Sequence, residues 1–418
     1  MDISHMVARL DHGIKKYGVK VIPMGLNRAF FKIRDSYDSL LFSSESKIHL
    51  DLLRRVESET CFIDLSCSPL QWYGSLFQRY KHMAIEFANL GGLSISGTLP
   101  KVDGVRFHKK LNNNHWIINP LNTKLRRCLE ECAKKATAPV LVRVQSTDFS
   151  TSLEDILRWK DLGFFVLYEY IDPFSPEISV HIPSRIITRH QFCCSDKSIF
   201  VCCTADSLME EVSSYRDNVF LSKNAVDLRH WKGDHKKKCE CRKIMNLKKP
   251  VIGYHGALAS WIDYDLLRYL ANTKKYSILL IGPKYDKSFD DSGIESCKDI
   301  HYIGTVDYND LPSYVYDYDV AIVPFKVNEL THAVSPLKLF EYMAAGKPIV
   351  TTETRECIQY KSCLTANNFY SFLQKIDTAL SLKDNIEYRN IIYQDALNNS
   401  WEQRAKKILK NCLNLVIN

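Results

Sequence analysis

The sequence predicts an α/β protein with two domains, each built on a doubly wound parallel sheet. The 418 residues are too many for one ordinary hydrophobic core. Segments typical of buried strands alternate with helix-forming segments in two separate series, which is the pattern of parallel sheets. The 45% hydrophobic and 25% charged fractions are typical of a globular protein. We therefore expect two α/β halves that face each other across a linker.

The first series of elements begins at Cys61. Residues 1–59 precede it, contain a strand-like VKVIPM and a predicted helix around KIHLDLLRRVES, and suggest no role. A strand at CFIDLS is followed by a loop and by a helix through FQRYKHMAIEFANLGG. Further strands are expected at HWIINP, PVLVRVQ and FFVLYEYI. The segment SIFVCCTADSLMEEV predicts a strand entering a helix, with Ser207 and Glu210 at capping-box spacing.

The alternation breaks at a polar, highly charged segment, so the interdomain linker is placed near residues 228–249. The second series begins at PVIGYHGAL and continues through YSILLIGP, DIHYIGT, DVAIVPF and KPIVTT. Ligands of open parallel sheets bind outside the carboxyl ends of the strands. Gly256, Gly282 and Gly304 end or follow three of these strands. We expect these glycines and the helix after Ser335 to line one cleft.

The segment SPLKLFEYMAAGKPIV predicts a short helix over 336–345. Ser335 is expected to cap the helix, and Pro336 suits its first position because proline has no amide to leave unpaired. Gly346 supplies a left-handed stop. Leu337 lies on the apolar face of this helix.

Lys338 and Glu341 stand one turn apart on another face of the same helix. A cation in the first turn faces the positive end of the helix dipole, which costs up to about 1 kcal/mol unless an anion offsets it. Glu341 has two interpretations. It either forms a surface ion pair with Lys338, worth about 0.3 kcal/mol, or accepts both hydroxyls of a ribose while the helix N-terminus receives phosphates.

Composition argues against a membrane-spanning or disulfide-linked protein. No apolar run approaches the roughly 20 residues that span a bilayer, and the N-terminus has no signal-peptide block. We therefore expect a soluble, cytoplasmic chain. Adjacent cysteines such as Cys193 and Cys194 lie in or beside apolar runs and are expected to be reduced core thiols. The CEC tripeptide at 239–241 lacks the second ligand pair of a zinc site.

Motifs of other enzyme classes are missing. No GxGxxG follows the first strand of either half, which disfavours a nicotinamide oxidoreductase, and no Ser/His/Asp signature stands out. Asp-Tyr-Asp occurs at 263–265 and 317–319, a pattern that can hold a metal and a diphosphate. Asp317 and Asp319 precede a strand instead of following one, so chance is the favoured interpretation. We expect no essential metal and no cofactor.

The formal net charge of +8 is unevenly spread. A predicted helix from Thr123, TKLRRCLEECAKK, and the segment GDHKKKCECRK are both basic. Solvated surface is one interpretation; attraction to an anionic membrane or an acidic acceptor is the other. Nucleic acid is disfavoured because no recognition motif accompanies the charge.

Several segments in order resemble one enzyme family. LFQRYKHMAIEFANLG looks like its first cleft helix, and KNAVDLRHW, which contains Asn224, resembles its Asn-Gly-Val-Asp signature. HYIGTVDYNDLPSYVYDYDVAIVPF and SPLKLFEYMAAGKPIV match its donor-domain core, and SWEQRAKKIL its terminal helix. From about Cys61 to the end, the chain therefore resembles the retaining GT-B glycosyltransferases of family four, in particular a bacterial surface-polysaccharide subgroup.

The resemblance gives roles to residues of the donor helix. Glu341 matches the second glutamate of the family's E-x7-E motif, which holds the donor ribose. Ala333 stands where the first glutamate is expected. GYHGALASWIDYD also lacks the arginine and lysine that follow the glycine in the family and neutralise the diphosphate. Lys338 is therefore predicted to supply this charge, with Arg79 of the first domain as the alternative.

The resemblance also implies a domain plan. Four parts are expected: an N-terminal extension of unknown role, an acceptor-side domain, a nucleotide-sugar-binding domain, and C-terminal helices that cross back to the first domain. Their predicted limits are 1–59, 60–240, 241–385 and 386–418.

The expected reaction is sugar transfer, with retention, from a nucleoside diphosphate sugar to a glycan or lipid-linked glycan. UDP is the predicted nucleotide on family frequency alone, and peripheral contact with the inner membrane face is an option. A nucleotide-sugar epimerase or hydrolase and a catalytically idle nucleotide-sugar binding protein are the alternatives.

The acceptor side offers few candidate residues. VLYEYIDPFSPEI ends a strand at the expected cleft, where the family often places a polar residue near the reacting sugar. Asp172 is the first candidate for binding or activating the acceptor hydroxyl, and Glu169 is the second. The alternative is that Asp172 is a turn residue before Pro173. Arg79 and Asn224 are expected at the same side of the cleft.

Overall fold

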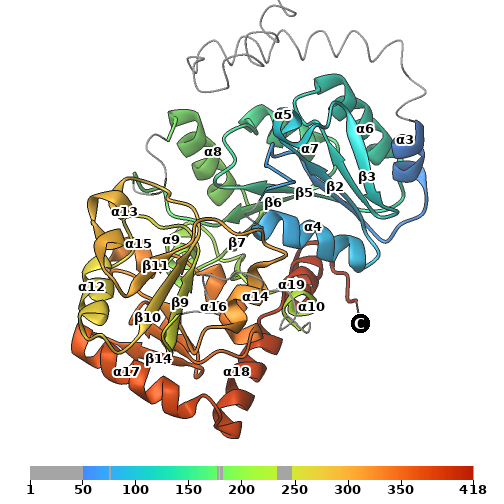
Figure 1. Ribbon diagram of the computed structural model, residues 1–418. Coiled ribbons are helices and arrows are strands. Elements are labelled where there is room, and N and C mark those ends of the chain that lie inside the picture. The colour runs from blue at the N-terminus through green and yellow to red at the C-terminus, as the bar shows by residue number, and fades with distance from the viewer. Residues whose placement is uncertain (1–49, 75–76, 177, 179–181, 233–246, 418) are drawn as a thin grey trace, which may run out of the picture.

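The structure is a computed structural model that describes residues 50–74, 77–176, 178, 182–232 and 247–417 (Figure 1). It confirms the predicted class: two α/β halves, each with its own sheet and with helices packed against it. The strand-like VKVIPM and the CEC tripeptide lie outside the described residues. In Figure 1 the first half is drawn in blue to green and the second mainly in yellow to red.

The first half contains an eight-stranded sheet with the order β3-β4-β2-β1-β5-β6-β7-β8. Only β3 and β4 pair antiparallel; the other neighbours are parallel. Both faces of this sheet are covered by helices, so the residues in its middle are buried, polar side chains as well as apolar ones. The strands are β1 (Ile63–Ser66), β2 (Leu93–Gly97), β3 (His108–Asn112), β4 (His115–Ile118), β5 (Val140–Gln145), β6 (Phe165–Tyr170), β7 (Phe200–Cys203) and β8 (Val219–Leu221).

The predicted helices of the first half are present, with one local error. α9 has Ala205 as its N-cap, without a side-chain hydrogen bond, and the Ser207 hydroxyl is buried without a partner. The predicted capping box of Ser207 and Glu210 is therefore wrong. The helices are α3 (Leu50–Glu57), α4 (Arg79–Asn89), α5 (Pro100–Asp103), α6 (Thr123–Lys135), α7 (Leu153–Asp161), α8 (Ser184–Ser195), α9 (Asp206–Ser213) and α10 (Leu228–Trp231).

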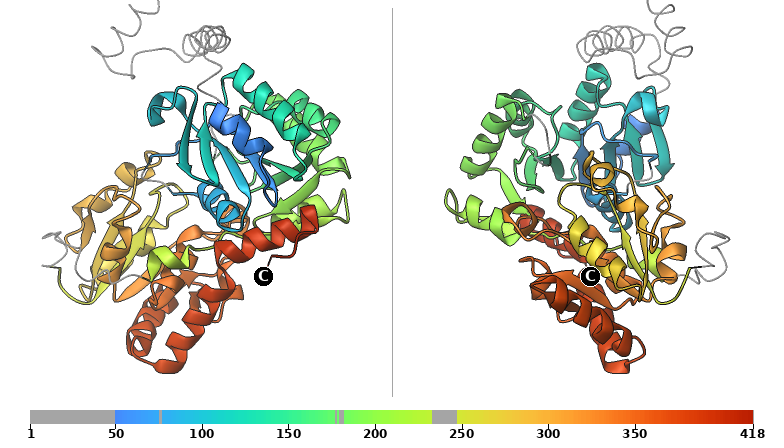
Figure 2. Two further views of the ribbon diagram at one scale, coloured as in Figure 1. Left: turned by 90° about the vertical axis from the view of Figure 1, so that its right-hand side faces the viewer. Right: turned by 60° about the vertical axis from the view of Figure 1, so that its left-hand side comes forward.

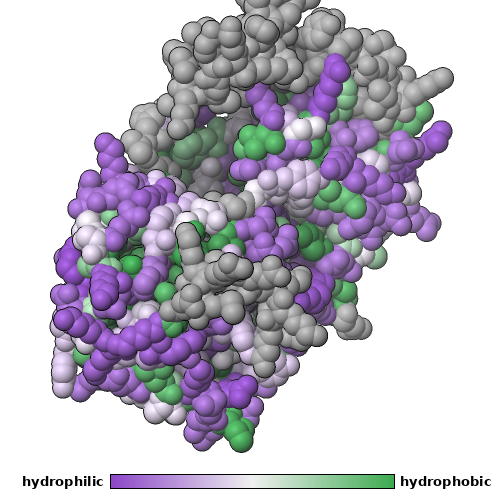
Figure 3. Space-filling model, viewed as in Figure 1, coloured by the Kyte–Doolittle hydropathy of each residue, from purple (hydrophilic) through white to green (hydrophobic). Residues whose placement is uncertain are grey.

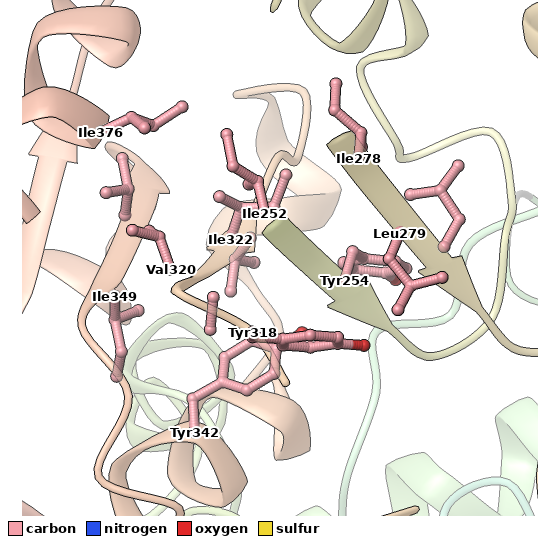
Figure 4. Packing of buried hydrophobic residues seen from close by; sticks show 14 of the residues in the cluster. Ile252, Tyr254, Ile278, Leu279, Tyr318, Val320, Ile322, Tyr342, Ile349 and Ile376 are labelled. Atoms are coloured by element: carbon pink, nitrogen blue, oxygen red, sulfur yellow. The ribbon is translucent and has the colours of Figure 1, made fainter. Parts of the chain in front are cut away.

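The second half contains a six-stranded parallel sheet with the order β11-β10-β9-β12-β13-β14. Its core is aliphatic around the strands and aromatic beneath β9, where Tyr318, Tyr342 and Tyr254 gather (Figure 4). A β-carbon on Gly253 would lie 2.2 Å from the Tyr318 ring, so only glycine fits there. The strands are β9 (Val251–His255), β10 (Ser277–Ile281), β11 (Ile300–Tyr302), β12 (Val320–Val323), β13 (Ile349–Thr352) and β14 (Cys363–Ala366).

The last helix joins the two halves. α18 packs against α16 of the second half, whereas α19 lies along α4 of the first half (Figure 2). Trp401 and Leu409 of α19 share a buried cluster with Phe87 of α4. The helices of the second half are α12 (Tyr264–Asn272), α13 (Ser288–Asp291), α14 (Leu311–Tyr316), α15 (Glu329–His332), α16 (Leu337–Ala344), α17 (Phe369–Leu382), α18 (Ile386–Asn398) and α19 (Trp401–Leu413); two short 3₁₀ turns are η3 (Ile294–Ser296) and η4 (Cys357–Gln359).

The surface and the thiols fit the composition. Hydrophilic side chains dominate the face shown in Figure 3, with scattered hydrophobic residues among them. Among the described residues, none of the helices is both long enough and apolar enough to cross a bilayer. The cysteines of the described residues are free thiols, and Cys193, Cys194, Cys202 and Cys203 are buried.

Candidate functional site

Three glycines lie side by side at the carboxyl edge of the second sheet. Gly256 follows β9, Gly282 follows β10, and Gly304 comes shortly after β11. The Gly256 amide donates to the carbonyl of Ile281 at 2.9 Å, and the Gly282 amide to the carbonyl of Gly304 at 2.8 Å. A β-carbon on Gly282 would lie 2.0 Å from the Gly256 carbonyl oxygen. This edge faces the first half of the molecule (Figure 1) and exposes backbone that a ligand can approach closely.

Lys338, in the first turn of α16, lies directly against Gly256. A β-carbon on Gly256, whose φ is +133°, would lie 2.5 Å from Cε of Lys338 and 3.1 Å from Nζ. The ammonium group faces the rings of Phe325 at 5.0 Å and Tyr254 at 5.3 Å. Among the described residues, no carboxylate forms an ion pair with it, so the surface pair with Glu341 is not formed.

Burial lowers the pKa of Lys338 to about 8, although the nearby Glu341 carboxylate favours the charged form. The side chain is thus a desolvated cation without a bonded anion, at the start of a helix whose own dipole opposes it. Such a group gains most from a ligand that brings negative charge.

Glu341 is buried, with 4% of its surface exposed, and pairs with a histidine. Nε2 of His255 lies 2.7 Å from Oε2 of Glu341. The His255 ring stacks on Trp231 at 6.0 Å, and its Nδ1 has no hydrogen-bond partner among the described residues. No described residue donates to Oε1 of Glu341, so this oxygen is the one left for a ligand hydroxyl.

Two more buried polar atoms lie in the surroundings of Glu341. The Trp231 indole Nε1 faces the Tyr308 hydroxyl, and neither atom has another hydrogen-bond partner among the described residues. Burial, together with the Glu341 carboxylate nearby, raises the pKa of Tyr308. The Tyr308 ring is held between Phe77 at 4.7 Å and His230 at 4.1 Å. Buried polar atoms are usually paired, so this group can receive the hydroxyls of a ligand.

The start of α16 differs from the prediction. The helix begins at Leu337, its N-cap is Pro336, and no side chain caps it. Ser335 instead binds the first half: the Asn224 amide donates to Oγ of Ser335 at 3.2 Å, and Nδ2 of Asn224 to its carbonyl at 2.7 Å. The capping role of Ser335 is therefore wrong, because Asn224 occupies its side chain. The first amides of α16 have no partner within the helix. Gly346 ends the helix with a φ of +63°, as predicted.

Arg79 and Glu169 lie in a buried ion network of the first half. Nε of Arg79 is 2.9 Å from Glu169, and Arg143 bonds both Glu169, at 3.4 Å, and Asp64, at 2.6 Å. Glu169 is fully buried. Although burial favours the neutral acid, the two arginines lower the pKa of Glu169. Arg79 and Glu169 form an ion pair with each other. This pairing argues against Glu169 as an acceptor-binding group and against Arg79 as a phosphate cation.

Asp172 lies two residues beyond β6 and turns toward the second half. It makes no hydrogen bond or ion pair with a described residue, and burial raises its pKa to about 7. Burial and the nearby Asp172 carboxylate raise the pKa of Tyr285, a residue of the second half. The Tyr285 hydroxyl donates to the Ile178 carbonyl at 2.8 Å. A carboxyl group with a pKa near 7 can accept a proton at neutral pH.

The Asp-Tyr-Asp tripeptides have structural partners. Asp263 caps α12 by accepting from the Leu266 amide at 2.9 Å, and Asp319 accepts from the Val251 amide at 2.7 Å. Asp319 therefore lies at the amino edge of the sheet, opposite the glycines. Within the described ranges, no three His, Cys, Asp or Glu side chains are placed to hold a metal ion together.

Sequence comparison adds an assignment for the second half. Residues 249–381 match the family model described as "Glycosyl transferases group 1". This region is therefore similar to the group 1 glycosyltransferases. TuaH of Bacillus subtilis, which is named as a teichuronic acid biosynthesis glycosyltransferase, is 29% identical over 161 residues. That match covers 36% of this chain and 40% of TuaH, so the chain matches less than half of this curated relative.

Solved structures share the two-domain arrangement of this chain. Sucrose-phosphate synthase of Thermosynechococcus elongatus has a TM-score of 0.58 at 15% identity, over 83% of this chain and 96% of that one. Anabaena HepE, solved with UDP-glucose, has a TM-score of 0.57 at 12% identity, over 85% and 100%. A UDP-forming trehalose-phosphate synthase of Burkholderia vietnamiensis has a TM-score of 0.60 at 12% identity, over 86% and 99%. The chain has the GT-B fold.

Residues that the sequence did not point out complete the site. His255 directly precedes Gly256, so its position was visible, but its partner Glu341 is 86 residues away along the chain. Trp231 and Tyr308 lie on a short helix and a loop without any periodic signal. Only the fold brings these three residues to Glu341.

Proposed function

We propose that this protein is a glycosyltransferase that moves a sugar, with retention, from a UDP-sugar to a glycan or lipid-linked glycan. One observation carries the proposal: Lys338 is a cation without a bonded anion, against Gly256, at the carboxyl edge of the group 1 domain. Glu341 lies one helical turn further along α16.

The donor diphosphate binds between Gly256 and the first turn of α16. Free amides at a helix start attract phosphate, and Lys338 adds a full positive charge to their partial one. The ribose hydroxyls bind Oε1 of Glu341, with Tyr308 and Trp231 as further partners. HepE, solved with UDP-glucose, and the UDP-forming trehalose-phosphate synthase support UDP as the nucleotide.

Catalysis rests on holding the reactants together and on stabilising the leaving diphosphate. Negative charge develops on the diphosphate as the glycosidic bond breaks, and Lys338 is placed to stabilise it in a desolvated site. Asp172, on the opposite half, accepts a hydrogen bond from the acceptor hydroxyl and takes up its proton. Lys338 supplies charge that a metal ion provides in other transferases, so we propose that no metal is essential.

The acceptor belongs to a cell-surface glycan. The name of TuaH, with its place in teichuronic acid biosynthesis, supports this class. Three exposed lysines of α6, Lys124, Lys134 and Lys135, support peripheral contact with an anionic membrane where a lipid-linked acceptor resides.

Incubation with a panel of nucleotide sugars tests the proposal. We expect UDP release that requires a glycan acceptor and continues in EDTA. Release or isomerisation without an acceptor would instead identify a hydrolase or an epimerase. Binding without any turnover would identify an idle nucleotide-sugar binding protein.

A further inference from the structure

Two aromatic side chains of the second half lie beside the proposed diphosphate site. The rings of Trp261 and Tyr285 are 5.4 Å apart at an angle of 47°. Tyr285 is 53% exposed, so its ring is accessible to a ligand. Trp261 follows Gly256 by five residues and is partly exposed.

The two loops that carry these rings are joined by backbone hydrogen bonds. The Leu258 amide donates to the Pro283 carbonyl at 2.9 Å, and the Tyr285 amide returns a bond to the Leu258 carbonyl at 2.9 Å. The Asp286 carboxylate accepts from the Ser260 amide at 2.9 Å. The two loops are therefore held together before any ligand arrives, which lowers the entropic cost of binding between them.

The loop that carries Trp261 pairs with the segment beside Lys338. Ile262, next to Trp261, pairs with Phe325, whose ring the Lys338 ammonium faces. The Lys326 amide donates to the Trp261 carbonyl at 2.9 Å. The loop that carries Trp261 therefore adjoins the proposed diphosphate site.

The first half supplies a polar group to the same place. The Tyr285 hydroxyl donates to the Ile178 carbonyl of the first half at 2.8 Å, and the Asp172 carboxylate lies near Tyr285 without a hydrogen-bond partner among the described residues. An aromatic surface on one side and a free carboxylate on the other suit a pyranose, whose C–H face packs on rings while its hydroxyls donate.

We propose that Trp261 and Tyr285 form the floor of a pyranose-binding subsite, with Asp172 opposite, a proposal that rests on the proposed function above. The pyranose is either the sugar of the donor or the terminal sugar of the acceptor. Both share the stacking chemistry, and the probes below distinguish them.

Saturation-transfer NMR tests the subsite on the full chain. UDP-glucose is the donor probe, and methyl β-D-glucopyranoside with UDP is the acceptor probe. Trp261→Leu and Tyr285→Leu remove the rings, Tyr285→Phe keeps the ring without its hydroxyl, and Tyr370→Leu changes an exposed tyrosine of α17. In each sample the uridine protons report whether the protein is folded and the nucleotide site is filled.

We expect both leucine variants to reduce hexose saturation, relative to uridine, by about threefold or more. Tyr285→Phe and Tyr370→Leu should resemble the wild type. A loss with UDP-glucose places the donor sugar on the rings, and a loss with the glucoside places the acceptor sugar there. Unchanged hexose saturation with both probes, or none in the wild type beside strong uridine signals, overturns the subsite alone. Absence of uridine saturation in the wild type rejects the proposed function and the subsite with it.

Discussion

One carboxylate oxygen of Glu341 is held by a histidine, and the other is available to a ligand. Its Oε2 is bonded to His255, and its Oε1 is free for a ligand. Glu341→Ala should weaken UDP binding by about 2 kcal/mol or more, because a charge-assisted pair of hydrogen bonds is lost from a desolvated site. Calorimetry measures this. Glu341→Gln, which still accepts from His255, is the control for packing, and unchanged UDP affinity in both variants would contradict the ribose role.

The protonation state of Asp172 should make the rate of transfer depend on pH. Because burial raises its pKa to about 7, the carboxylate that accepts a proton is lost as the pH falls through 7. We expect kcat/KM to decline on the acidic side of about pH 7 in the wild type. Asp172→Asn should reduce kcat about a hundredfold or more and remove this decline, with donor affinity unchanged. Wild-type turnover by Asp172→Asn would reject the assignment.

At the scale of single residues, the sequence predicted those that lie in a motif or at the end of a strand. The glycines and Lys338 come together because the carboxyl ends of parallel strands share one edge. Ser335 was mispredicted as a cap because Asn224, 111 residues away, binds its side chain. Arg79 was a plausible phosphate cation until the fold paired it with Glu169.

At the scale of elements, the contact between α16 and the end of β9 is the feature that makes the site. A methyl group on Gly256 would displace the Lys338 side chain, and alanine is strained at a φ of +133°. Gly256→Ala should therefore lower UDP affinity about as much as removal of Lys338, and lower stability by about 2 kcal/mol.

Gly293→Ala is the matched control for this substitution. Gly293 also has a positive φ, +62°, but no atom lies within 4 Å of an added β-carbon. We expect a loss of about 1 kcal/mol in the free energy of unfolding and no change in UDP affinity. Equal UDP affinity in Gly256→Ala and the wild type would show that the contact with Lys338 is irrelevant to binding.

Two of the strands that the sequence did not predict, β2 and β3, are short and polar. β2, with the sequence LSISG, offers little hydrophobic signal, yet it is fully buried because Ser94 donates to Asp64 at 2.7 Å inside the sheet. β3 consists largely of exposed residues at the sheet edge. Strands with continuous apolar runs, such as β10 and β12, were predicted because burial on both faces selects such runs.

At the scale of the whole molecule, the alternation of strands and helices predicted two domains, and the polar segment between them marked the division. How they dock was not predictable from periodicity. Lys223 of the first half binds Glu356 of the second at 2.9 Å, and α19 returns to α4. These contacts join residues far apart in sequence and leave no local pattern.

The basic helix α6 gives a prediction for membrane association. Arg126 and Arg127 pair with Asp155, at 2.8 Å, and Glu130, at 3.5 Å, and Lys124 and Lys134 are exposed. If the acceptor is lipid-linked, Lys124→Ala/Lys134→Ala/Lys135→Ala should weaken sedimentation with anionic vesicles, at about 1 kcal/mol per lysine at low salt. Equal recovery of the wild type with anionic and neutral vesicles would leave only a solvated surface.

A single calorimetric comparison tests most directly whether a donor diphosphate binds between Gly256 and Lys338. UDP and uridine are titrated into the wild type, Lys338→Met and Lys347→Met. Lys347 is the matched control because burial lowers its pKa to about 8 as well, but it lies at the opposite edge of the sheet. Lys338→Met should weaken UDP binding by about 2 kcal/mol, leave uridine binding unchanged, and leave stability equal or slightly higher. Equal weakening of both ligands, or of neither, would contradict the assignment of Lys338 as the phosphate cation.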